Sequence, residues 1–168
     1  MGFSRLWCGV LAVPLVFGLS GCSPEPPGFV AVGKDDAGRL VGVMVSCSDP
    51  ADRAVLARLD QHGDPAGPSI AEWTFPQHAE TGTSPLVWPM FGPSANPSGP
   101  GVSSTTGLPD GALALSIQRD PENGATGVDF TAKEIEGLSG NQYAFHASNT
   151  QEVTHGDLKT FLKYADCG

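Results

Sequence analysis

Short runs of alternating hydrophobic and polar residues recur through residues 29–168, and glycine, proline and aspartate separate them. Such alternation is typical of β-strands with one buried face. The predicted strands are 29–33, 39–47, 53–60, 69–75, 86–88, 112–119, 126–130 and 142–147. Residues 53–60 also fit a short helix, and that alternative stays open. In 39–47 both alternating faces are largely apolar, which indicates a central strand in a hairpin with 29–33.

Two short helices complete the pattern. The sequence Thr-Ala-Lys-Glu at 131–134 has the spacing of a capping box, so we expect a helix over 132–138. Leu158, Phe161 and Leu162 recur at helical spacing and predict a last helix. Many short strands, turns between them and only two helices predict a mainly β fold, an antiparallel β-sandwich.

The segment 76–109 is rich in proline, which excludes a helix or a central strand through most of it. We therefore expect a long loop at 85–109, with 86–88 as a short edge strand inside it. Several aromatic residues surround this loop, so it is the surface on which we expect any binding.

Trp73, Trp88 and Phe91 are the candidate binding residues near this loop. Aromatic side chains beside a loop can recognise a sugar or a peptide. Aromatic residues in a sandwich more commonly pack in its core, which is the preferred interpretation for Trp73. Within the loop, residues 85–101 are the part that we predict to form a binding surface.

The first residues follow a different pattern. A single positive charge at Arg5 is followed by an uncharged apolar run at 6–18, and then by small residues and Cys22. This is the order of a secretory signal, and the run is too short to span a membrane. An uncleaved N-terminal anchor is the alternative. The predicted parts of the chain are a signal peptide at 1–21, a proline-rich tether at 22–28 and a single domain at 29–168.

Leu19-Ser20-Gly21-Cys22 resembles the lipobox of bacterial lipoproteins. The resemblance implies that Cys22 is lipidated on its sulfur and becomes the first residue of the mature chain. It also implies attachment to the outer face of the cytoplasmic membrane. Several acyl chains bind a membrane firmly, because each buried methylene contributes about 0.8 kcal/mol.

The segment 128–143 and the hairpin 29–41 are similar to recurring pieces of small, uncharacterised actinobacterial envelope lipoproteins and secreted proteins. This resemblance implies an envelope location and a β fold, and it implies no particular activity. Leu138 with Tyr143 resembles the tyrosine corner of fibronectin type III domains, with a spacing one residue short. The implied fold is a sandwich of the immunoglobulin or fibronectin-III type.

The chain is acidic, with 9 basic and 18 acidic side chains. Removal of residues 1–21 takes away Arg5 and no acid, which leaves 8 basic side chains against the same 18 acids. A surface of this charge repels phosphate backbones, so we expect no nucleic-acid partner. It also repels anionic lipid headgroups, so the membrane attachment must come from acyl chains.

Four cysteines have different expected roles. Cys8 leaves with the signal peptide and Cys22 carries lipid, while Cys47 and Cys167 remain in the exported domain. An even pair in an oxidising compartment predicts a disulfide between them. Two separate buried thiols are the alternative.

The sequence contains few patterns that carry chemistry. No Gly-x-Ser-x-Gly and no Ser-x-x-Lys pattern occurs, so serine hydrolase sites of those types are unsupported. The nearest group of possible metal ligands is His146, His155 and Asp157, which lacks the spacing of a metal site, so we predict no metal and no cofactor. Glu72 beside Trp73 stays open as half of a glycosidase site.

These observations predict a lipid-anchored extracytoplasmic lipoprotein that acts as a binding or structural module of the cell envelope, with an envelope component as its partner and no evident catalysis. An envelope hydrolase and a carrier of a small ligand or metal are the alternatives. A cleft with convergent polar groups near Glu72, His78 or His146 would indicate the enzyme. A filled core with only shallow surfaces would indicate the module.

Overall fold

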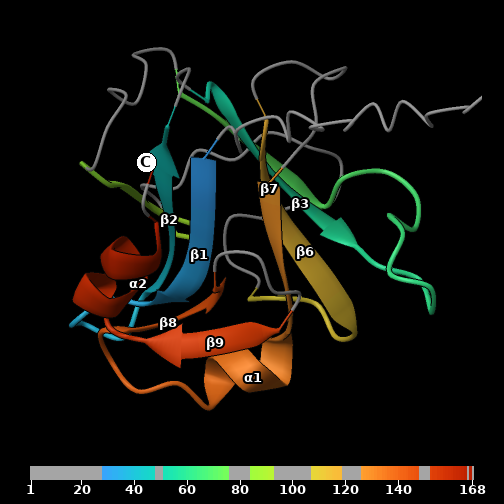
Figure 1. The fold of residues 1–168 in the computed structure, drawn as a ribbon. Helices are drawn as coiled ribbons and strands as arrows, with labels where there is room; N and C mark the ends of the chain where they lie inside the picture. Colours follow the sequence, from blue (N-terminus) through green and yellow to red (C-terminus); the bar gives the residue numbers. More distant parts are fainter. Residues whose placement is uncertain are drawn as a thin grey trace, which may run out of the picture.

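Two antiparallel sheets and two short helices make up the described part of the chain (Figure 1). The computed structural model describes residues 28–47, 51–75, 84–92, 107–118, 126–147, 152–165 and Cys167. The elements are β1 (Gly28–Lys34), β2 (Leu40–Ser46), β3 (Arg53–Arg58), β4 (Ala71–Thr74), β5 (Leu86–Pro89), β6 (Ala112–Gln118), β7 (Thr126–Thr131), α1 (Ala132–Glu136), β8 (Gln142–His146), β9 (Val153–Gly156) and α2 (Leu158–Tyr164). The mainly β class with two short helices is confirmed.

One sheet has five strands in the order β5-β2-β1-β8-β9, and the other has four in the order β4-β3-β6-β7. β1 and β2 form the predicted hairpin, and β2 lies between β5 and β1 as a central strand. Residues 53–58 form a strand, which decides between strand and helix for that run. The backbone N–H groups of Ala37 and Arg39 donate to the Asp35 carboxylate (3.0 and 2.8 Å), which fixes the hairpin turn.

The two sheets bury a common hydrophobic core. It takes alternate residues from both sheets, because successive side chains of a strand point to opposite faces. Its large members include Val30, Val32, Met44, Leu56, Trp73, Leu113, Leu115, Ile117, Val128 and Phe130. The alternation in the sequence predicts the buried face of β4 and β6 correctly. In β3 it is wrong, because Val55 and Ala57 face outward while Ala54 and Leu56 are buried.

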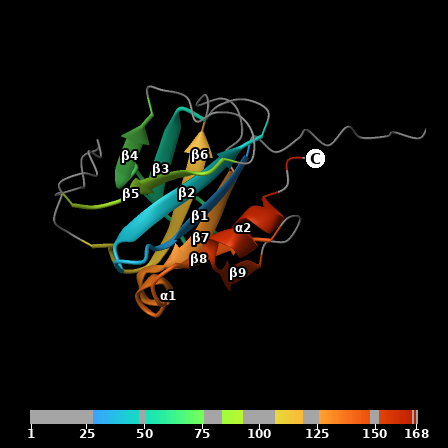
Figure 2. The same cartoon turned by 90° about the vertical axis from the view of Figure 1, so that its left-hand side faces the viewer.

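Helix α2 covers the other face of the five-stranded sheet (Figure 2). Phe161 of α2 is buried and lies edge-on to Phe145 of β8, with ring centroids 5.4 Å apart. Asp157 begins the helix by accepting a hydrogen bond from the Thr160 backbone N–H (2.7 Å). The predicted Cys47–Cys167 disulfide is present, with Cα atoms 5.1 Å apart, and it joins the chain beyond α2 to the end of β2.

Helix α1 begins with the predicted capping box. The Thr131 side chain accepts from the Glu134 N–H (3.2 Å), and Glu134 accepts from the Thr131 N–H (2.7 Å). The helix ends at Glu136, earlier than predicted. Lys34 of β1 donates to the carbonyl oxygens of Glu136 (2.8 Å) and Leu138 (3.0 Å), so a distant strand supplies partners at this helix end.

Strand β9 is not among the predicted strands. It has four residues, of which only Val153 is a large hydrophobe, so its sequence shows no alternation. It forms by pairing with β8, where Val153 lies opposite His146. Strand β5 confirms the short edge strand expected at 86–88.

The N-terminal predictions lie mostly outside the described residues. The signal peptide at 1–21, Cys22 and the tether as far as residue 27 are among them, and β1 begins at Gly28. The same holds for residues 93–106 of the expected loop. Within the described ranges, no helix has the length and apolar character needed to cross a membrane.

Candidate functional site

The outer face of the four-stranded sheet is hollowed into a groove of about 460 Å³. Its floor consists of outward-facing residues of β3 and β6. These floor residues are Val55, Ala57, Ala114 and Ser116. They lie in pairs across the two strands, Val55 opposite Ser116 and Ala57 opposite Ala114, so small side chains adjoin one another and leave the surface low.

The loop between β3 and β4 forms one wall of the groove through Gly63, Pro65 and Gly67. Leu59 pairs with Pro65 across this loop, and the Ala66 N–H donates to the Arg58 carbonyl oxygen (2.8 Å). The loop therefore extends the edge of the sheet, and this extension stands higher than the neighbouring floor of the groove.

Polar side chains converge at one end of the groove. Arg53 donates to the Gln118 side-chain oxygen (2.8 Å), and its guanidinium lies 3.9 Å from the Glu72 carboxylate. Ser69 donates to the same carboxylate (2.7 Å). The Arg53 and Glu72 side chains remain 28% and 33% exposed, so these groups are held in place and still reach solvent.

The described lining of the groove includes few groups that could carry catalysis. No histidine or cysteine is among its described lining residues. Its two carboxylates, Glu72 and Asp129, lie on β4 and β7, with β3 and β6 between them. Strands spaced about 4.8 Å apart put those backbones about 14 Å from each other. Glycosidases need two carboxyl groups about 5–9.5 Å apart, and these two residues come from strands at opposite edges of the sheet.

Comparison with known proteins gives no match. Neither the family models, nor the curated protein sequences, nor the solved structures contain a match to this chain.

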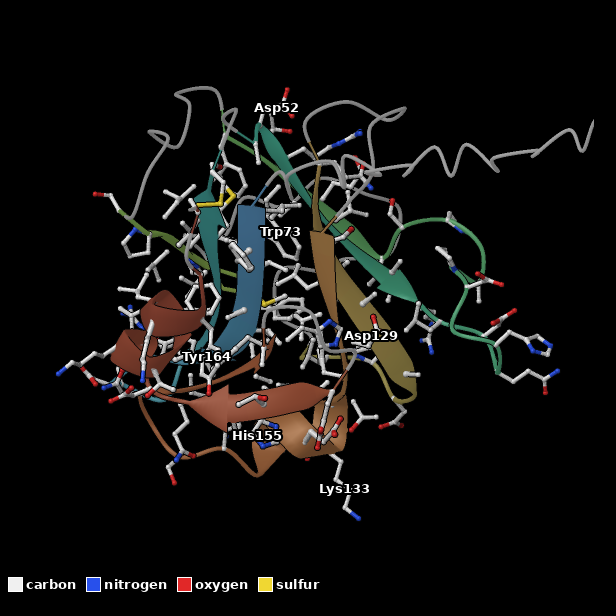
Figure 3. The ribbon with its side chains drawn as sticks, in the orientation of Figure 1. Asp52, Trp73, Asp129, Lys133, His155 and Tyr164 are labelled. Carbon is white, nitrogen blue, oxygen red and sulfur yellow. A yellow bond between two sulfur atoms is a disulfide. The ribbon has the colours of Figure 1, made fainter. Side chains whose placement is uncertain are left out.

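A second hollow, of about 540 Å³, lies beside α1 and is lined by residues that include Lys133, Gln142 and His155. Figure 3 shows His155 and Lys133 at this end of the molecule. Two of its other lining side chains, Thr131 and Glu134, form the capping box, and Gln142 accepts from the Ser139 N–H (3.1 Å). Much of its polar capacity is thus used within the fold.

Trp73 and Trp88 lie in the core between the sheets. They are 2% and 5% exposed, and their ring centroids are 6.3 Å apart. Trp88 lies across Gly42 of the neighbouring strand, where an added Cβ would meet its ring. Neither indole N–H has a partner within the described ranges. Phe91 is half-buried and packs against the same core, so we assign these rings to packing.

The histidines that the sequence offered as metal ligands do not converge. His146 is half-buried on β8, and its Nε2 has no partner in the described part of the chain. His155 is exposed on β9, and Asp157 caps α2. Among the described residues, no three His, Cys, Asp or Glu side chains are close enough to hold a metal ion. His78 lies outside these residues.

Three pKa shifts have structural causes away from the groove. Hydrogen bonds from Arg39 hold the pKa of Asp35 below its usual value, and those from Thr160 do the same for Asp157. Burial raises the pKa of Tyr143. These groups belong to a turn, a helix cap and the packing beneath α2, so none of them indicates a catalytic centre.

Sequence reasoning singled out Glu72 but missed the other polar residues of the groove, which are Arg53, Ser69, Gln118 and Asp129. The available signal was the outward half of each alternating strand. On β6 those positions are small or polar, as expected for a face without a covering layer, whereas on β3 the outward Val55 gave no such signal.

Proposed function

We propose that this protein is a lipid-anchored, extracytoplasmic binding module of the cell envelope, and that the groove on the four-stranded sheet is its binding surface. One observation carries the proposal. Helix α2 covers the outer face of one sheet, whereas the outer face of the other is a groove of small residues with convergent polar groups at one end.

The proposed location depends on the N-terminal sequence and is supported by the disulfide. An apolar run at 6–18 followed by small residues and Cys22 is the order of a lipoprotein signal. Disulfides persist in oxidising compartments outside the cytoplasm, and Cys47 is joined to Cys167. Export and acylation at Cys22 account for both features.

We further propose that the fold is a sandwich of the immunoglobulin or fibronectin-III type. Such folds place strands A, B and E in one sheet and C, F and G in the other. The orders β1-β2-β5 and β3-β6-β7 match that arrangement, with β4 beside β3 and with β8 and β9 added next to β1. Tyr143 lies on the added strand β8, so the tyrosine-corner resemblance does not support this assignment.

An envelope hydrolase is the weaker proposal. Polar groups do converge near Glu72, as such an enzyme would require. The backbone of Asp129, which carries the second carboxylate, lies about 14 Å from that of Glu72 across the sheet, and no imidazole or thiol is among the described lining residues. The Ser69 hydroxyl donates to the Glu72 carboxylate, but no imidazole accompanies this pair among the described lining residues.

The anchor is tested by fractionating cells that express Cys22→Ala beside the unaltered chain. We expect the unaltered protein in the membrane fraction, with an intact mass that includes acyl chains and lacks residues 1–21. The variant should be soluble or unprocessed. Cys8→Ala is the matched control, because it removes a cysteine from the same segment and should change nothing. Undiminished membrane retention of Cys22→Ala would contradict the anchor.

The groove is tested with a photo-crosslinking amino acid placed at Ser116, on its floor, or at Lys159, on the exposed side of α2. We expect a discrete adduct in intact cells from position 116 and none from position 159. Equal labelling from the two positions would show that the groove has no special role.

A further inference from the structure

We propose that the groove binds an extended, basic peptide segment of a partner protein. This inference rests on the proposed function, because it names the occupant of the same surface. It is argued from the shape of the groove, from the groups on its walls and from its charge.

The shape of the groove fits an extended chain. The outward row on β3 runs from Arg53 to Leu59, which is about 20 Å at a rise of about 3.4 Å per residue. An extended peptide of about six residues has the same length. The floor of Val55, Ala57 and Ala114 is apolar and low along this row, so it leaves room for small or linear side chains.

The lining favours a peptide over a sugar. None of the described lining residues is aromatic, and Trp73 and Trp88 are buried in the core, so this part of the chain offers no ring in the groove for stacking on a sugar. A peptide backbone alternates donors and acceptors. The Arg53 guanidinium donates, and the Gln118 amide and the Ser116 hydroxyl can each donate and accept, which suits that alternation.

The charge around the groove favours a basic peptide. Glu72 and Asp129 lie on opposite sides of the floor, and Asp60 and Asp64 lie in the loop that forms one wall. Arg53 is the cation among the described lining residues and it pairs with Glu72, so Asp129, Asp60 and Asp64 supply the net negative charge around the groove. Since the chain carries a net charge of −9, lysine or arginine side chains would be attracted to both sides of the groove.

The test uses the lipidated full chain in nanodiscs of neutral lipid and two fluorescent hexapeptides, Ala-Lys-Ala-Lys-Ala-Lys and Ala-Glu-Ala-Glu-Ala-Glu. Fluorescence anisotropy should detect binding of the first peptide and not of the second. Ala114→Phe fills the floor and should weaken that binding at least about tenfold. Asp129→Asn should weaken it about two- to fivefold at low salt, and less at high salt.

Ala112→Phe is the matched control, because Ala112 lies on the same strand, is exposed and does not line the groove. It should leave the affinity unchanged. If Ala114→Phe fails to fold by circular dichroism, Ser116→Tyr fills the same floor and replaces it.

The inference is overturned if the two peptides bind alike, or if filling the floor has no effect on the basic peptide. It is also overturned if a chito-oligosaccharide competes for the groove while neither peptide binds, or if Ala114→Phe changes the oligomeric state in sedimentation, which would indicate a second copy as the occupant. Crosslinking from Ser116 in cells distinguishes failure of the peptide inference from failure of the proposed binding function. Adducts without peptide binding would remove only the peptide, whereas the loss of both would remove the binding function of the groove.

Discussion

The disulfide and helix α2 together give the most quantitative prediction. Cys47 and Cys167 close a loop of 120 residues. Chain-entropy arguments give about 5 kcal/mol for a loop of that length, and losses of about 2–5 kcal/mol are typical when a small secreted domain loses a disulfide. We therefore expect the variant Cys47→Ala/Cys167→Ala to lose about 2–5 kcal/mol of unfolding free energy.

The structure connects this loss to the docking of α2. The helix has seven residues, too few to be stable alone, and Phe161 is its buried contact with the sheet. Phe161→Ala should cost about 3–5 kcal/mol in the oxidised protein. Because both changes weaken the attachment of one helix, their effects should be non-additive by at least about 1 kcal/mol in a double-mutant cycle.

Urea unfolding followed by tryptophan fluorescence measures these energies, since Trp73 and Trp88 become exposed only on unfolding. The matched control is the unaltered protein with its disulfide reduced by a thiol. It should lose about as much stability as the double alanine variant. A variant within about 1 kcal/mol of the oxidised parent would show that the bridge does little for the folded state. Additive effects would refute the assignment of both changes to α2.

Three further predictions concern single contacts. Gly42→Ala places a Cβ against the Trp88 ring, so it should cost about 1–3 kcal/mol in urea unfolding. Thr131→Ala removes the capping box of α1 and should cost about 1 kcal/mol, whereas Thr131→Ser should restore most of it. Arg39→Gln removes the hydrogen bonds from the Arg39 side chain that lower the pKa of Asp35, so NMR titration should show this pKa rising toward 3.8.

The sign of the last effect follows from linkage. Asp35 has a folded pKa below its unfolded value, so its contribution to stability is present above the unfolded pKa and is lost as pH falls through the folded pKa. Asp35→Asn should therefore make the free energy of unfolding less dependent on pH in that acidic range. An unchanged Asp35 titration in Arg39→Gln would show that the Arg39 side chain does not lower the pKa of Asp35. Likewise, unaltered unfolding of Gly42→Ala or Thr131→Ala would count against the corresponding contact.

Local signals in the sequence predicted the elements that local chemistry decides. The apolar alternation of 39–47 identified a central strand, and the residues at 131–134 identified a helix start that the structure contains. Strand β9 was not predicted, because its pairing with β8, and not its own hydrophobicity, makes it a strand. Its position depends on contacts between distant parts of the chain.

The candidate site was less accessible to the same reasoning. Whether Ala57 and Ala114 line a groove depends on which sheet face a helix covers, and a strand pattern does not contain that information. Trp73 could be interpreted as core or as recognition surface until its neighbours were known. The proposed lipid at Cys22 depends on processing and lies outside the described residues, so it stays a prediction.

The place where β1 begins has a mechanical consequence. Any tension on the chain ahead of Gly28 enters β1, which is hydrogen-bonded to β2 on one side and to β8 on the other. Because antiparallel hydrogen bonds run perpendicular to the strands, tension along β1 loads both ladders in shear. A pull along β1 therefore strains many of these bonds together, whereas a pull across the strand would open them one at a time.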